Sequence, residues 1–432
     1  MDWRSMGVVW VLGFSFPLSG AGQEAEPGSV SETINVFADC PRGGCDQDYF
    51  RTEMPYVNWM RDRQDADVHI LVTPQRTGAG GRLYTLAFIG QGEHAGVESS
   101  LERSTAQDAT QEEVRQTMAK AISLGLVGYL ANSALGDRLT VAYEAPSEGG
   151  PTAATPDDDP WNFWVFNLSA RGRFNGQSTS KSQNLNGSTS ANRTTEDLKV
   201  RLGVNVNYNE NEFELSTGTL NTIQRNLSFN GLVAWSLGKH WAFGPQAVAS
   251  SSTFLNQHLN LRFAPTLEYN FFPYSESTRH QLTFSYAAGA NYFDYNETTI
   301  FGQDEETVFD QTVRTTLDLR EQWGSASISL EGATFLDDFD KNRVTLFGNV
   351  NVRLIRGLSL DIFGSYSRVR DQIFLERGGA TDDEVLLRLR QLGTDFTYFT
   401  SVGLRYTFGS IFNNVVNSRM DNISGGGGFF FF

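Results

Sequence analysis

The sequence predicts a mainly β protein: a transmembrane antiparallel up-and-down β-barrel of about twelve strands, preceded by a small α/β sandwich domain. Aromatic residues are common, with 32 Phe, 14 Tyr and 8 Trp, yet the mean hydropathy is only −0.33. From residue 161 onward, apolar and polar residues alternate with a period of two, which is typical of strands with one apolar face. Short and long connections alternate between these segments, as they do in barrels of the bacterial outer membrane.

The N-terminus is typical of a secretory signal peptide. Arg4 precedes a short apolar run over residues 8–18, and Ser19-Gly20-Ala21 supplies the small residues of a cleavage site. The apolar run is too short to cross a bilayer as a helix. A buried N-terminal strand is the alternative, but it explains neither the arginine nor the small residues. We therefore predict a signal peptide over residues 1–21 and export of the mature chain.

The chain has two cysteines, Cys40 and Cys45, separated by four residues that include two glycines. In an oxidising compartment such a pair closes a short disulfide loop. The alternative is half of a metal site, but no second cysteine pair or nearby histidine completes one. The sequence predicts a disulfide, and it predicts neither a metal site nor a cofactor.

Residues 30–145 predict a small periplasmic α/β domain. Its expected elements are a strand at 33–38, a helix at 46–61 that Pro55 would kink, a hairpin of strands at 68–73 and 83–89, a helix from 110 and a closing strand at 139–143. Thr110 and Glu113 have the spacing of a capping box at the start of the second helix. The predicted order is β-α-β-β-(β)-α-β, a small sandwich of helices on a sheet.

Two features of this domain invite functional readings. The run Gly78-Ala79-Gly80-Gly81 joins two predicted strands and lacks the Lys and Ser/Thr of a phosphate-binding loop, so we interpret it as a hairpin turn. His69 lies in an apolar strand and His94 in a glycine-rich turn, and we expect both to be structural.

Residues 146–160 contain four prolines, two glycines and three consecutive aspartates. This composition is typical of an extended, solvated linker. The character of the sequence changes after it, and we place the start of the barrel at residue 161.

Residues 161–417 predict the barrel itself. In the segment 344–354, for example, Val344, Leu346, Val350 and Val352 alternate with polar residues. Lipid cannot hydrogen-bond a free strand edge, so a spanning sheet must close on itself and show one face to lipid and the other to the lumen. A soluble β-sandwich also alternates, but its strands are shorter.

The connections predict the strand number. Five short ones lie at 194–197, 238–240, 275–279, 322–324 and 356–357, and six longer ones at 183–188, 209–224, 251–257, 295–308, 336–342 and 373–394. Eleven connections make about twelve strands. Short turns face the periplasm in such barrels, so an even strand number leaves both chain ends on the side of the N-terminal domain.

Several stretches carry a resemblance to a known family. They are FPYSESTRHQLTFSY (272–286), DYNETTIFG (294–302), LSLDIFGSYSRVRDQI (358–373), EVLLRLRQLGT (384–394) and YTFGSIFNNVVN (406–417). In these motifs the chain resembles uncharacterised outer-membrane β-barrel proteins of Gram-negative bacteria, over most of residues 161–417. The resemblance implies the fold but no reaction. One departure is the C-terminal tail, residues 418–432, which ends in GGGGFFFF beyond the expected last strand.

The alternation places a basic set of side chains toward the predicted lumen. The lumen-lining candidates are Arg171, Arg173, Lys199, Arg201, Arg262, Glu268, Arg314, Asp318, Arg320, Arg353, Asp361 and Arg405, together with Glu331. Two readings remain open. A water-filled pore with these walls would favour anions. A filled interior would use the same arginines in networks of ion pairs.

Composition and residue types also restrict the function. The net charge of −16 argues against nucleic acid as a partner, because phosphate binding needs a basic surface. We predict no enzyme: His258, near Ser250–Ser252, offers the only weak hydrolase pattern in the barrel, and acidic loops such as Asp337–Asp340 are expected to be solvated rather than to hold Ca²⁺. The leading hypothesis is a structural or envelope-interaction protein that contacts outer-membrane lipid and, through its periplasmic domain, a protein partner. The alternative is a narrow channel for small anionic solutes.

Overall fold

The computed structural model describes residues 33–40, 45–78, 80–131, 133, 135–140, 142, 159–215, 218–378, 390–412 and 414. The predicted signal peptide, nearly all of the predicted linker and the C-terminal tail lie outside these residues. None of the helices within the described ranges combines the length and the hydropathy that crossing a membrane requires.

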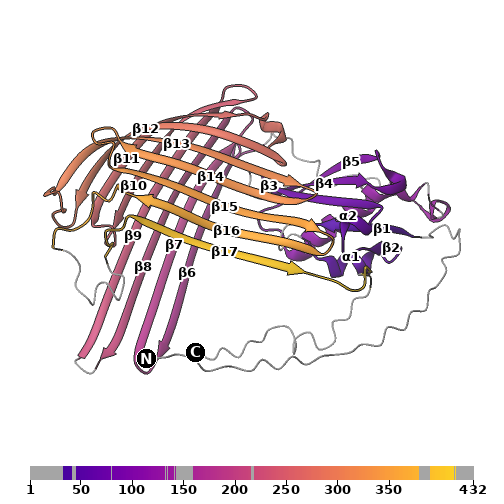
Figure 1. The fold of residues 1–432 in the computed structure, drawn as a ribbon, viewed down its shortest axis with the longest axis horizontal. Coiled ribbons are helices and arrows are strands. Elements are labelled where there is room, and N and C mark those ends of the chain that lie inside the picture. The colour runs from indigo at the N-terminus through magenta and orange to yellow at the C-terminus, as the bar shows by residue number, and fades with distance from the viewer. Residues whose placement is uncertain are drawn as a thin grey trace, which may run out of the picture.

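The N-terminal domain is a five-stranded mixed sheet with helices packed against it (Figure 1). Its elements are β1 (Ile34–Asp39), α1 (Gln47–Glu53), β2 (Val57–Trp59), the 3-10 turn η1 (Arg63–Asp65), β3 (Val68–Arg76), β4 (Arg82–Gly90), η2 (Gly92–His94), β5 (Glu98–Thr105), α2 (Gln111–Leu130) and η3 (Gly136–Arg138). The strand order is β2-β1-β3-β4-β5, with β1 parallel to both β2 and β3.

Local sequence explains both helices. The Asp46 side chain accepts a hydrogen bond from the Tyr49 amide at the start of α1. At the start of α2 the expected capping box is present: the Thr110 hydroxyl accepts from the Glu113 amide, and the Glu113 carboxylate accepts from the Thr110 amide. The buried side of α2 packs with α1 and the sheet in one hydrophobic core.

Two predictions for this domain were wrong. The predicted helix at 46–61 ends at Glu53, and residues 57–59 form strand β2 instead, because Pro55 stops the helix and the β-branched and aromatic residues that follow pair with β1. The predicted closing strand at 139–143 does not form within the described residues of that segment. The optional strand of the predicted order is present before α2 as β5, and with β2 added the order is β-α-β-β-β-β-α.

Twelve long strands follow. They are β6 (Trp164–Gln177), β7 (Ser180–Thr194), β8 (Leu198–Leu215), β9 (Gly218–Ser236), β10 (Trp241–Ser252), β11 (Gln257–Asn270), β12 (His280–Tyr295), β13 (Glu305–Glu321), β14 (Gly324–Phe335), β15 (Asn342–Ile355), β16 (Leu358–Val369) and β17 (Phe396–Tyr406). Every strand pairs antiparallel with its neighbour in sequence. The predicted fold class, an antiparallel up-and-down arrangement of twelve strands behind a small α/β domain, is confirmed.

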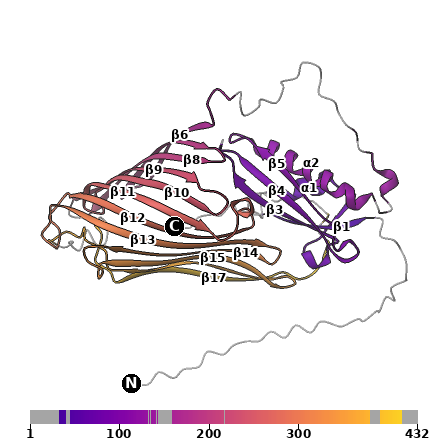
Figure 2. The same cartoon turned by 90° about the horizontal axis from the view of Figure 1, so that it is seen from above.

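The two end strands of this sheet are not paired with each other. In the hydrogen-bonding order β6 and β17 stand at opposite ends, and the described residues show no ladder between them. The sheet curves, and Figure 2 shows β6 and β17 on opposite sides of an opening that the N-terminal domain faces. The expected closure of the barrel is therefore not formed in this structure.

The connections agree with the prediction except at two places. The predicted loops at 183–188 and 209–224 lie within strands, because β7 runs from 180 to 194 and β8 ends only at 215. Their polar side chains look like loop residues, but they belong to regular strands and pair with polar residues of the neighbouring strand. The last connection, 370–395, is the longest one between neighbouring strands of the sheet, as expected, although its residues 379–389 lie outside the described ones.

Candidate functional site at the domain–sheet interface

The twelve-stranded sheet separates its side chains into two unlike faces. Paired residues share a face, and successive residues alternate between faces. The face that carries Arg262, Asp310 and Asn351 is here named the polar face, and the opposite one the apolar face. On the apolar face lie large exposed side chains from every strand: Phe166, Leu168, Phe174, Leu185, Val206, Leu227, Phe243, Leu261, Phe263, Phe284, Phe309, Val313, Ile328, Leu330, Leu346, Tyr366, Val402 and Leu404.

Every residue predicted to line the lumen lies on the polar face. The strand register places there Arg171, Arg173, Lys199, Arg201, Arg262, Glu268, Arg314, Asp318, Arg320, Arg353, Asp361 and Arg405. Whether this face encloses a lumen stays a prediction.

The segregation is not complete, because phenylalanines also lie on the polar face. Phe347, Phe363 and Phe399 lie on the polar face of three neighbouring strands. Their rings meet edge to face, with centroids 5.7 Å and 5.5 Å apart. A purely polar lumen was expected from the alternation, and these residues form an aromatic patch within it.

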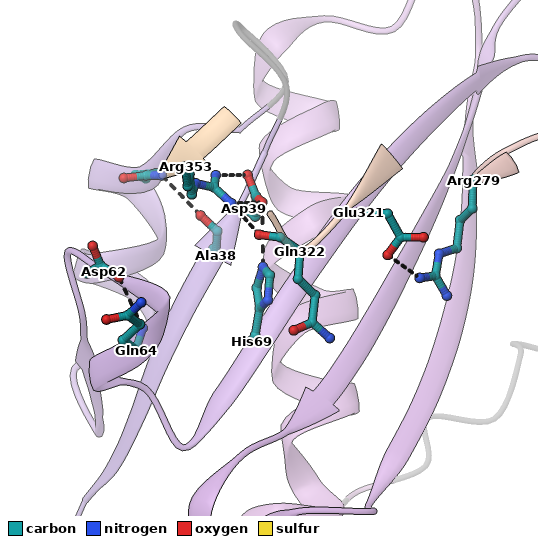
Figure 3. A network of polar contacts seen from close by, with 10 residues as sticks. Ala38, Asp39, Asp62, Gln64, His69, Arg279, Glu321, Gln322 and Arg353 are labelled. Carbon is teal, nitrogen blue, oxygen red and sulfur yellow. Dashed lines mark hydrogen bonds and ion pairs between the residues drawn. The ribbon is translucent and has the colours of Figure 1, made fainter. Parts of the chain in front are cut away.

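The N-terminal domain docks on the sheet through an ion pair between Asp39 and Arg353 (Figure 3). Asp39 is the last residue of β1, and Arg353 projects from the polar face of β15. Both terminal guanidinium nitrogens of Arg353 donate to the Asp39 carboxylate at 2.6 Å. This is the bidentate geometry that favours Arg over Lys. Arg353 also donates to the Gln322 carbonyl at 3.1 Å and lies over the Phe37 ring, 5.3 Å from its centroid.

A second partner of Asp39 lies inside the domain. The His69 ring, on β3, is completely buried, and its Nε2 lies 3.5 Å from the Asp39 carboxylate. We predicted a structural role for His69. Because its ring lies next to the Asp39 carboxylate, it is also part of the docking contact. The sequence missed Asp39 itself, because an aspartate at a strand end carries no signal of a partner 314 positions away.

The Asp39 contacts predict a pH dependence of docking. Burial alone would raise the pKa of Asp39, but the contacts with His69 and Arg353 outweigh it and lower the pKa from 3.8 to about 2. Because the docked pKa is the lower one, the carboxylate stabilises docking fully above the ordinary value of 3.8 and loses this contribution as the pH falls toward 2. His69 belongs to the same domain as Asp39, so only the part of this shift that Arg353 causes is lost on undocking, and we expect docking to weaken as the pH falls through this range. Cross-linking of the domain to the sheet as a function of pH checks it, and a flat profile would contradict it.

Further contacts join the domain to the short turns of the sheet. Arg356, in the turn between β15 and β16, pairs with Asp65 at 2.5 Å. The Gly357 amide in the same turn donates to Asp62 at 2.8 Å. These carboxylates belong to η1 and to the residue before it. This turn of the domain therefore contacts the β15–β16 turn of the sheet through its two carboxylates.

The segment after β17 continues onto the domain. Residues 410–412 and 414 lie next to the end of β2, the edge strand of the domain sheet: the Arg61 amide donates to the Ile411 carbonyl at 2.9 Å, and Met60 and Phe412 form an isolated antiparallel bridge. The Trp59 amide donates to the Asn414 side chain at 2.5 Å. The segment thus adds an isolated bridge at this edge of the domain sheet.

The opposite side of the domain contacts β6 and β7. The Gln107 side chain donates to the Asn167 side chain on β6. Gly78 lies so close to Thr194, at the end of β7, that an added Cβ would stand 2.9 Å from the threonine Cβ. The domain therefore bridges the two sides of the opening between β6 and β17 at the short-turn end.

A cavity of about 800 Å³ lies where the domain meets the polar face. Residues Leu71–Pro74 of β3 form one wall, and polar-face side chains of β13 to β17 form the other. Three predicted lumen residues line it: Arg320, Arg353 and Asp361. The domain therefore covers part of the predicted lumen.

The remaining predicted lumen residues divide into paired and unpaired groups. Arg262 makes a two-pronged ion pair with Asp310, at 2.8 Å and 3.0 Å, across Gly289, where a side chain would clash with both groups. Arg314 pairs with Glu331, and Glu268 accepts from the Tyr274 hydroxyl. Among the described residues of the predicted lumen set, the side chains of four exposed arginines make no hydrogen bond or ion pair: Arg171, Arg173, Arg201 and Arg405.

The long-loop end of the sheet is also partly covered. Ile373, from the loop after β16, is 2% exposed and packs with Phe293 and Tyr295. The Asn256 side chain donates to the Phe374 carbonyl, and the Ile300 amide to the Leu375 carbonyl. This loop folds back across the connections that flank β11 and β12.

The other candidate residues do not assemble a site. His258 Nδ1 lies 2.7 Å from the Asp294 carboxylate, while the hydroxyls of Ser251 and Ser252 bond to backbone groups. Cys40 and Cys45 are joined in a disulfide that follows Asp39 directly. Among the residues that the structure describes, no three His, Cys, Asp or Glu side chains gather in a way that would hold a metal ion.

Comparison with known proteins gives only distant likeness. No protein-family model and no curated protein sequence matches the chain. Among solved structures, the NanC porin is similar at a TM-score of 0.27 and 10% identity, covering 56% of this chain and 100% of that one. The β domain of the Bordetella autotransporter BrkA is similar at a TM-score of 0.24 and 13% identity, covering 57% of this chain and 98% of that one. Likeness at this level says nothing about a substrate or partner of this chain.

Proposed function

We propose that this chain is an outer-membrane protein with a structural or envelope-interaction role, exerted through a periplasmic domain that caps the short-turn end of its sheet. One observation carries the proposal: large exposed apolar side chains gather on one face of all twelve strands, while the docked domain and the predicted lumen residues belong to the other. Soluble proteins rarely expose continuous apolar patches of this kind. Strands of 11 to 19 residues are long enough to cross a bilayer, which takes about 9–11.

The domain has surface left for a partner while it is docked. Strand β5 ends the domain sheet, and its outer edge has no neighbour among the described strands. The Leu124 side chain on α2 is exposed as well. An extended segment of an envelope protein could add to the β5 edge by main-chain hydrogen bonds, as in other cases of strand addition.

Fractionation of a Gram-negative host that produces the full chain tests the proposal. We expect the protein in the outer-membrane fraction, resistant to extraction with urea, and with the faster gel migration of an unheated barrel. The domain should resist protease in intact cells and be digested once the outer membrane is permeabilised. Recovery in the soluble periplasmic fraction would contradict the membrane location.

A narrow channel for small anionic solutes is the second candidate. It is favoured by Arg171, Arg173, Arg201 and Arg405, whose charges face the polar side without a partner among the described residues. The docked domain and the folded loop at 370–378 favour the first proposal, because they cover part of both ends.

Conductance in a planar bilayer separates the two candidates. For the capped protein we expect no steady current from the purified, folded chain. Anion-selective steps that fall in Arg201→Gln but persist in Asn205→Gln, a neutral change on the same face of β8, would support the channel and overturn the closed state.

A further inference from the structure

The free edge of β5 is regular along its whole length. Strand β5 pairs with β4 from Thr105 opposite Arg82 to Glu98 opposite Ile89 without a bulge. It ends the domain sheet on the side away from β2 (Figure 1). Natural sheet edges are commonly protected by proline, lysine or a bulge, and residues 98–105 contain none of these. The edge is therefore able to accept a further strand.

The ladder between β4 and β5 identifies the residues that face outward. The Gly90 amide donates to the Val97 carbonyl at 2.9 Å, and in an antiparallel ladder every second pair along the register exchanges such bonds. The amides and carbonyls of Ser99, Leu101 and Arg103 consequently point to β4. The outward-pointing set consists of Glu98, Ser100, Glu102 and Ser104. In agreement with this assignment, the Arg103 guanidinium donates to the Glu102 carbonyl at 2.7 Å.

Two of the outward residues give the edge a negative charge. Glu98 and Glu102 are exposed, and their side chains lie on the sheet face opposite the helices. Neither carboxylate forms an ion pair within the part of the chain that the structure describes, and on this face β4 offers them only the neutral side chains of Thr85, Ala87 and Ile89. The two carboxylates stand four residues apart, which is about 13 Å along a strand.

These charges make a second copy of β5 a poor occupant of the edge. If two β5 edges paired antiparallel with most of their length overlapping, Glu98 and Glu102 of one copy would lie opposite or diagonal to glutamates of the other. Like charges in these positions destabilise a strand pair, whereas opposite charges stabilise it. Charge complementarity therefore selects a strand with basic residues at the positions that face the two glutamates.

The other face of β5 favours apolar neighbours. Leu101 lies on the helix side, where it is only partly buried against the hydrophobic core of the domain. Val97 precedes the strand on the same side and is 49% exposed. An added strand would place its alternate residues over these two side chains and remove their apolar surface from water.

We propose that the β5 edge binds an extended cationic segment of an envelope protein, which adds antiparallel as a sixth strand of the domain sheet. The segment has the pattern basic, apolar, any residue, apolar, basic. Its basic residues face Glu98 and Glu102, and its apolar residues contact Leu101 and, diagonally, Val97. The inference rests on the proposed function above, because a periplasmic domain meets envelope proteins, and it names the chemistry of the partner.

Peptide binding to the purified full chain tests this inference. The probe is a fluorescein-labelled peptide with the core Lys-Val-Thr-Val-Lys between Gly-Ser ends, and the comparison peptide has Glu in place of each Lys. We expect fluorescence anisotropy to rise to saturation with the first peptide and binding of the second to be at least about tenfold weaker. Hydrogen exchange of the amides in residues 98–104 should slow when the first peptide binds.

Three variants locate the binding site. Glu98→Lys combined with Glu102→Lys should reverse the preference between the two peptides. Ser100→Pro removes one outward amide without breaking a bond to β4, and it should weaken binding about fivefold or more. Asp137→Lys is the matched control, because it makes the same charge change on an exposed residue of η3 and should leave binding unchanged.

The other outcomes overturn the inference in distinct ways. No binding of the Lys peptide to the folded chain would overturn it outright, and equal binding of both peptides would overturn the charge preference. Binding that leaves residues 98–104 unprotected would place the peptide elsewhere. Dimers of the peptide-free chain with these residues protected would assign the edge to a second copy. Fractionation reports the membrane location independently, and the titration uses protein from whichever fraction contains it, so the two failures are distinguishable.

Discussion

Replacing Asp39 with asparagine is expected to weaken docking of the N-terminal domain by about 2–3 kcal/mol, which is a change of roughly 30- to 150-fold in the docking equilibrium. Asparagine keeps the shape of the side chain but removes the charge that Arg353 binds through two hydrogen bonds. The guanidinium is only 27% exposed and would be left without a counter-ion. Removing the charge from a fully buried pair would cost more. The expected cost is smaller for this pair, because water reaches the edge of the contact.

A protease site placed within the predicted linker at 146–160 makes this measurable. After cleavage, the fraction of the domain that remains with the sheet gives the docking equilibrium. Asp65→Asn is the matched control, because its partner Arg356 is 48% exposed and the pair should contribute less than about 1 kcal/mol. Equal retention of the wild-type and Asp39→Asn domains would show that the ion pair does not hold the interface.

Leu330→Arg is expected to prevent stable assembly in the membrane. Leu330 lies at the middle of β14 on the apolar face and is 49% exposed in this structure. If that face contacts lipid, an arginine at mid-depth costs about 2–4 kcal/mol, and it must also displace a well-placed apolar side chain. We expect the outer-membrane fraction to fall and the heat-modifiable band to disappear.

Ser327→Arg is the control for this experiment. Ser327 lies on the same strand but on the polar face, opposite Asp318. An arginine there gains a carboxylate neighbour and should leave the outer-membrane fraction near the wild-type level. Equal tolerance of both substitutions would mean that the apolar face does not meet lipid, and it would remove the main support for the membrane location.

The sequence predicts the long strands well because alternation is a local property. Each strand displays its own period of two, so side chains as distant as Arg171 and Arg405 could be placed on one face without knowing which strands are neighbours. The number of glycine-containing and polar turns then predicts the number of strands. The same local logic identifies the capping box of Thr110 and Glu113, because that contact spans only three residues.

The predictions that were wrong have a different physical cause. They concern residues whose structure depends on partners far away in the sequence. Residues 57–59 continue a helical pattern in sequence, but pairing with β1 is worth more than a helix turn beyond Pro55. Residues 183–188 look like a loop because Asn and Ser rarely fill a strand. Here their polar side chains face others across the strands, and the Asn207 side chain donates to that of Asn186. The docking site could not be predicted, because Asp39 and Arg353 become neighbours only after two domains have folded.

The contact of residues 410–412 and Asn414 with the domain also depends on synthesis of the whole twelve-stranded sheet. Asn414 bonds to Trp59 across 355 positions, and Phe412 lies against Met60. A chain whose synthesis stops early, or whose twelve strands fail to form, cannot deliver this segment, and the edge of β2 then stays bare. Bare strand edges invite chaperones, proteases and aggregation. The domain sheet is thereby joined by a segment that follows all twelve long strands in sequence, so this contact can form only after those strands have been synthesised.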